Sequence, residues 1–208
     1  MITQDKIELN YARWIERLKK YGCYSERMID EIGEDIKNAS FALQENSGCA
    51  YQGAMLDMVL NNLCTLAYHI NNDAFGENDK GRNRHSLLQV NMNMLMRVLL
   101  LQHIAKAEMF ILQEQAWKAK NGYLYDFNGK LKSILKCGER SIYLCMKYGI
   151  ELTEEEYEAM RILDKEDDKT NPYLSPLCQM VKMVNQLAVI ESRQDYLSKN
   201  KQENNKEV

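Results

Sequence analysis

Residues 87–112 read LLQVNMNMLMRVLLLQHIAKAEMFIL, and the rest of the chain can be placed around this stretch. Apolar side chains fall on nearly every side of a helix drawn through it, which is typical of a helix buried inside a helical domain. Its longest unbroken apolar run, residues 98–101, is far too short to cross a membrane. We therefore expect a central helix whose core-facing side includes His103.

Length and composition predict one domain with appendages. The chain has 208 residues with 27 basic and 30 acidic side chains, a formal net charge of -3 that does not favour nucleic acid as a partner. The N-terminus is polar and lacks the apolar core of a signal peptide. The six cysteines lie far apart without any CxxC spacing, so we expect reduced thiols in the cytoplasm.

The periodicity of apolar residues predicts an all-α fold with a small β-hairpin near residues 122–129, where Asn128-Gly129 follows alternating aromatic residues. Helices are expected at about 5–20, 25–36, 51–75, 132–148, from a capping box at Thr153, and from Ser175-Pro176. Residues 76–85 and 165–171 are expected to be loops. We predict N-terminal helices in 1–48, a helical domain in 49–192 and a polar, disordered tail in 193–208.

Several segments together resemble the phage-encoded branch of the HD-domain superfamily, whose active members are all-helical, metal-dependent phosphohydrolases. YQGAMLDM at 51–58 is similar to the family's Y-x-G-G-L-x-x-H, and LLQHIAK at 100–106 is similar to L-x-H-D-x-x-K. CGERS at 137–141 is similar to H-G-E-x-S and is followed by LTEEEYEAMR at 152–161, while VNQLA at 184–188 takes the place of A-D-x-x-A. The resemblance covers about residues 51–192 and implies an HD-like helical bundle.

The departures from the family pattern are more informative than the matches. The positions that correspond to the family's metal-binding pocket are Met58, His103, Ile104, Cys137, Glu139, Leu163 and Asn185. Among the metal ligands only His103 keeps its residue type. An isoleucine cannot bridge metals, and a thioether or a neutral amide is a poor ligand for hard cations. Glu139 is explained by its place at a helix start. We therefore expect a vestigial pocket with no catalytic residue, no metal and no cofactor.

The resemblance then implies a catalytically inactive module that works through protein partners. These would be copies of itself in a homo-oligomer, components of a phage particle such as a connector or ring, or a host protein. The contact surfaces considered are the acidic residues 151–158, the basic residues 80–84 and the polar tail. We expect no contact with membranes and no binding of nucleic acid, and a location in the cytoplasm or within a phage particle.

Two alternatives remain open at this stage. The first is a phosphohydrolase acting on nucleotides or other phosphoesters through a non-standard site for Mn, Fe, Mg or Zn. A His103–Cys137 pair could also form a nucleophile, although a core histidine and a buried thiol explain the two residues as well. The second alternative is a non-catalytic sensor that binds nucleotide through Arg97, Lys106 or Arg161.

Overall fold

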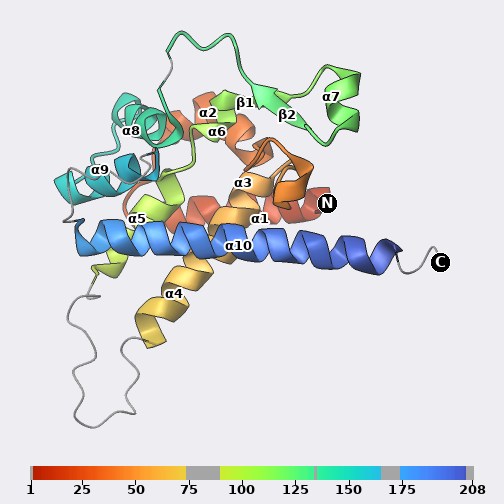
Figure 1. Ribbon diagram of the computed structural model, residues 1–208. Helices are drawn as coiled ribbons and strands as arrows, with labels where there is room; N and C mark the ends of the chain where they lie inside the picture. The colour runs from red at the N-terminus through yellow and green to blue at the C-terminus, as the bar shows by residue number, and fades with distance from the viewer. Residues whose placement is uncertain (1, 74–89, 134, 165–173, 205–208) are drawn as a thin grey trace.

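The computed structural model describes residues 2–73, 90–133, 135–164 and 174–204 and shows a mostly helical fold with a two-stranded sheet at its edge (Figure 1). The all-α prediction with a small hairpin is confirmed. The N-terminal half contains α1 (Gln4–Lys20), α2 (Glu26–Asn38), the 3-10 turn η1 (Glu45–Ser47), α3 (Ala54–Asp57), the π-helical η2 (Met58–Leu63) and α4 (Cys64–Asp73). The remainder contains α5 (Met92–Leu101), α6 (Lys106–Met109), β1 (Phe110–Leu112), α7 (Ala116–Lys120), β2 (Tyr125–Phe127), α8 (Cys137–Lys147), α9 (Glu154–Arg161), η4 (Ile162–Asp164) and α10 (Pro176–Asn204).

Several helix ends are set by the local sequence as expected. The Ser25 hydroxyl accepts a hydrogen bond from the backbone N–H of Met28 and starts α2. Thr153 and Glu156 form the predicted capping box of α9. Gly22 follows α1 with a φ of 66°, a left-handed conformation that ends the helix and that other residues adopt only at a cost.

Helix α5 lies at the centre of the fold and contacts α1, α4, α9 and α10. Its residues from Val98 to Leu101 are all buried, in agreement with the expectation from sequence. The indole N–H of Trp14 on α1 donates to the carbonyl of Leu100 at 3.1 Å, so α1 is tied to α5 by a buried polar contact as well as by packing. The N-terminal helices therefore share one hydrophobic core with the later part of the chain.

The central helix is shorter than its apolar sequence suggests. It ends at Leu101, residues 102–105 form turns, and the helix of residues 106–109 is a single turn before strand β1. Ser141 of α8 explains this end, because its hydroxyl donates to the carbonyl of Gln102 at 2.9 Å and accepts from the N–H of Ala105 at 3.2 Å. Side-chain bonds thus replace the backbone bonds that would have continued α5. The prediction of one helix over 87–112 is wrong.

The small sheet pairs strands that are separated by a helix. β1 runs antiparallel to β2, with Phe110 opposite Phe127 and Leu112 opposite Tyr125, and α7 lies in the connection between them. The 122–129 region supplies one strand as expected. Asn128, however, follows β2 and bonds back to the carbonyl of Met109, so Asn128-Gly129 leaves the sheet and does not form the turn between its strands.

Helix α10 crosses the molecule and extends to Asn204, past the point where a disordered tail was expected (Figure 1). A close approach to η1 holds this part of the helix, because a Cβ on Gly48 would lie 2.3 Å from the carbonyl oxygen of Ser192. The predicted loops at 76–85 and 165–171 lie outside the described residues. Among the described helices, none combines the length and the apolarity that spanning a bilayer requires.

Candidate functional site

Three positions of the predicted vestigial pocket lie together although they are far apart in sequence. His103 lies in the turn after α5, Cys137 starts α8, and Asn185 is in the middle of α10. The imidazole Nε2 of His103 is 3.0 Å from Oδ1 of Asn185, and its Nδ1 is 4.0 Å from the Cys137 sulfur. We refer to these residues, with their neighbours Gln102, Ile104, Phe41 and Lys106, as the His103 cluster.

The hydrogen bonds of Asn185 define the protonation of His103. The amide nitrogen of Asn185 donates to the carbonyl of Val181 at 2.8 Å. The amide oxygen of Asn185 therefore faces the imidazole and accepts from Nε2–H. The Nδ1 lone pair then faces the thiol of Cys137. Gln102 exchanges two longer bonds with the same amide, at 3.3 and 3.4 Å. The polar atoms of the cluster therefore bind mainly to one another.

Apolar and cationic groups complete the cluster. The ring of Phe41 contacts the imidazole of His103 edge-on, with 4.8 Å between the ring centroids. The ammonium of Lys106 lies 3.6 Å from the Phe41 centroid and also donates to the Phe41 carbonyl. Burial and, to a lesser extent, the positive charge of Lys106 lower the pKa of His103 to about 3, against the opposing effect of the bond to Asn185. His103 is therefore a neutral imidazole at physiological pH.

The other predicted pocket residues lie around the cluster or apart from it. Ile104 is fully buried in the core, and Leu163 is half-buried against it. Met58 lies apart from the cluster. Its sulfur accepts a hydrogen bond from the Ser192 hydroxyl at 3.7 Å, and Ser192 is seven residues beyond Asn185 on α10, which corresponds to a rise of about 10 Å along the helix. The Glu139 carboxylate accepts from the N–H of Lys136, which agrees with its predicted role at the helix start.

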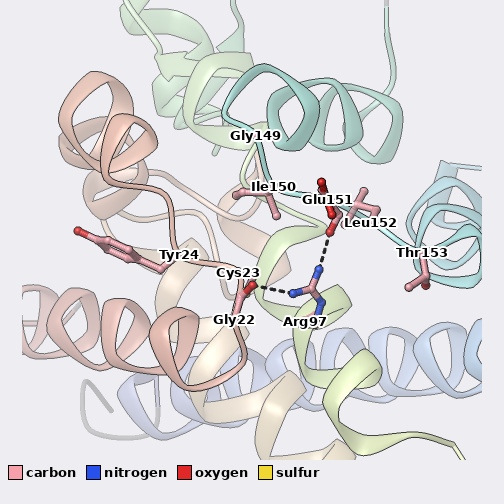
Figure 2. Close-up of a pocket in the computed structure, with 9 residues that line it drawn as sticks. All are labelled: Gly22, Cys23, Tyr24, Arg97, Gly149, Ile150, Glu151, Leu152 and Thr153. Atoms are coloured by element: carbon pink, nitrogen blue, oxygen red, sulfur yellow. Dashed lines mark hydrogen bonds between the residues drawn. The ribbon is translucent and has the colours of Figure 1, made fainter.

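The three cationic residues considered for ligand binding lie in different places. Arg161 is exposed at the end of α9, and the ammonium of Lys106 lies over the ring of Phe41. Arg97 lies in a pocket of about 430 Å³ between the α1–α2 and α8–α9 connections, as Figure 2 shows. Its guanidinium donates to the carbonyls of Gly22 and Glu151 and is therefore committed within the chain.

Glu156 forms an ion pair with Arg97 that the sequence did not predict. Its carboxylate is buried and lies 2.6 Å from Nε of Arg97, while it also closes the capping box at Thr153. Burial lowers the pKa of Arg97, but the hydrogen bond to Glu156 and the negative charge of that carboxylate together outweigh burial and raise the pKa. The capping box was recognisable in the sequence, whereas its buried ion pair with a helix 59 residues away was not.

A second cleft, of about 730 Å³, lies between the sheet, η1 and the end of α10. Asp57 lies in its wall and accepts from Tyr51 at 2.7 Å, Lys6 at 3.0 Å, Asn61 at 2.6 Å and Asn10 at 3.1 Å. Burial raises the pKa of Asp57, but these bonds outweigh burial and lower it. With its oxygens already accepting four bonds, Asp57 acts here as the junction between α1 and α3, and it is not available as a metal ligand.

The described residues contain no group of three or more His, Cys, Asp or Glu side chains placed to hold a metal ion. Comparison of the chain with protein-family models, with curated proteins and with solved structures found no match. The geometry of the His103 cluster is therefore the main guide to the chemistry of this chain. Its arrangement supplies one neutral histidine and one thiol, each already facing a neighbour.

Proposed function

We propose that this chain is a catalytically inactive HD-like scaffold that acts through protein contacts, either in a phage particle or as a phage protein bound to a host partner. One observation carries the proposal. His103, Cys137 and Asn185, which the resemblance assigns to one pocket, meet in one cluster, in which the buried imidazole of His103 contacts the half-buried side chains of the other two. This supports an HD-like arrangement of helices in which contacts between side chains have replaced metal coordination.

The cluster is also unfavourable for a cation. The Nε2 of His103 donates to Asn185 and so presents no lone pair, and the position of the family's aspartate is the buried apolar Ile104. A pocket that kept its charged ligands without metal would be costly to bury, whereas these replacements stabilise the fold.

The proposal is tested by measuring metal content and hydrolysis on the same preparation. We expect substoichiometric Mn, Fe, Mg and Zn, and no metal-dependent release of phosphate from a panel of nucleotides. The control is His103→Gln, which should behave as the natural chain does. A stoichiometric metal together with phosphate release that disappears in His103→Gln would overturn the proposal in favour of a phosphohydrolase.

A further inference from the structure

Residues 110–127, which form β1, α7 and β2, carry large apolar side chains that face solvent; we call this segment the aromatic arm. Leu112 is 70% exposed, Trp117 65% and Phe127 58%, with Ile111 and Tyr123 also exposed. Leu112 and Phe127 point to the same face, because their partners across the sheet are Tyr125 and Phe110. Side chains of these types gathered on one projecting element are typical of a protein–protein contact.

The surroundings of the aromatic arm are basic. Residues 110–136 contain five lysines and two acidic residues, although the whole chain has a net charge of -3. One of the acids, Asp126, is already paired with Lys118 at 2.9 Å. Lys120, Lys130 and Lys132 are exposed. A partner of the arm is therefore expected to combine apolar side chains with an acidic rim.

The chain itself contains such a surface on α8 and α9, which pack against each other. Tyr143, Met146 and Tyr157 are exposed there, with Met146 at 71%. Residues 151–161 contain five glutamates and one arginine, and of these glutamates only Glu156 is buried. We call this surface the acidic face. It provides apolar anchors surrounded by the charge that complements the arm.

We propose that the aromatic arm of one copy docks on the acidic face of a second copy, so that the chain assembles head to tail. This rests on the proposed scaffold function and names its partner. The arm and α9 lie at opposite ends of the molecule in Figure 1, so each copy can use its arm and its face at the same time. A contact of this heterologous kind produces a ring when the rotation closes and a filament when it does not.

The exposed apolar side chains supply part of the area that a specific contact needs. Fully burying a large aromatic side chain removes roughly 150–250 Å² from water, and the aromatic residues of the arm are already partly covered. Together with the lysines beside them, they contribute to the roughly 800 Å² per partner that a stable interface buries. Trp117, the most exposed aromatic residue of the arm, is the expected hot spot.

The test uses two variants of the full chain that each lose one surface. The arm variant is Trp117→Ser with Phe127→Ser, and the face variant is Glu154→Lys with Glu155→Lys. We expect the natural chain to form assemblies larger than a dimer in light scattering, and each variant alone to be monomeric, with association weakened about thirtyfold or more. A mixture of the two variants keeps one intact arm and one intact face, so it should form a heterodimer and nothing larger.

A control variant separates this contact from general surface apolarity. Leu9→Ser removes an exposed leucine on α1, away from both surfaces, and should leave assembly unchanged. A natural chain that stays monomeric, an arm variant that assembles normally, or a mixture that remains monomeric would each overturn the head-to-tail contact. None of these outcomes affects metal content or hydrolysis, which decide the scaffold proposal separately.

Discussion

The His103 cluster and the aromatic arm distribute polarity in opposite ways. In the cluster, the imidazole of His103 and the amide of Gln102 are buried, and they contact the half-buried amide of Asn185 and thiol of Cys137. In the arm, a tryptophan, a phenylalanine and a leucine face solvent beside exposed lysines.

This contrast indicates where the chain retains the capacity to bind. A buried group whose hydrogen-bond partners lie within the fold has little to offer a ligand, and removing it damages the fold. An exposed apolar group contributes little to folding and gains most when a partner covers it. Substitutions in the two regions should therefore differ in kind, with effects on stability in the cluster and effects on association in the arm.

Ile104→Asp, which places the aspartate of the HD pattern at this position, should strongly destabilise the fold. The new carboxylate would be buried without a prepared partner, and we expect the free energy of unfolding to fall by about 3–5 kcal/mol. Urea denaturation measures it. Ile104→Val, which removes one methylene group at the same position, should lose only about 1 kcal/mol. A variant that is as stable as the natural chain and binds a divalent ion would show that the pocket is open.

Glu156→Ala tests a second buried polar contact near the core. The substitution leaves the Arg97 guanidinium largely buried without its carboxylate and also breaks the capping box of α9. A loss of about 3–5 kcal/mol is expected in the same denaturation experiment. Glu155→Ala is the matched control, because Glu155 is an exposed neighbour on the same helix and its removal should change stability by less than about 0.5 kcal/mol.

His103 should make the stability of the chain depend on pH. Its pKa is about 3 in the folded chain and near 6.5 when unfolded, so the unfolded state binds an extra proton between these values. Stability is complete above pH 6.5 and falls as the pH decreases toward 3. Between pH 7.5 and 5.5 the loss from this residue is about 1.4 kcal/mol. His103→Gln should remove this contribution to the pH dependence of the free energy of unfolding. An unchanged pH dependence would contradict the lowered pKa of His103.

Much of the fold could be predicted from local patterns in the sequence. The capping residues Ser25 and Thr153 and the glycine after α1 mark helix ends through contacts within a few residues. The end of α5 could not be predicted in this way, because it depends on Ser141, which lies 39 residues from Gln102 in sequence. The sequence likewise does not identify β1 as the partner of strand β2, because the two strands are separated along the chain by α7.

The candidate site shows the same limit. The resemblance grouped His103, Cys137 and Asn185, which lie beside one another in the structure, but the residues that fill the cluster with them, Phe41 and Gln102, carry no motif. The alternating aromatic residues at 123–127 predict a strand but not its exposure, and Phe127 is mostly exposed. Exposure of an aromatic residue depends on what the rest of the fold places beside it, and alternation along a strand does not contain that information.

The smallest effect on stability is expected for Trp117→Ser, and the other tryptophan, Trp14, gives a direct comparison. Trp117→Ser in the arm should change the free energy of unfolding by less than about 0.5 kcal/mol, because the side chain is mostly in water in the isolated chain. Trp14→Ala in the core should cost about 3–5 kcal/mol, since that ring is fully buried and its N–H bonds to Leu100. Fluorescence of the natural chain adds an independent measurement, with Trp117 accessible to acrylamide in the monomer and protected on assembly. Quenching that is the same in both states would show that the arm stays in water, and the contrast between the two regions would then not reflect a binding surface.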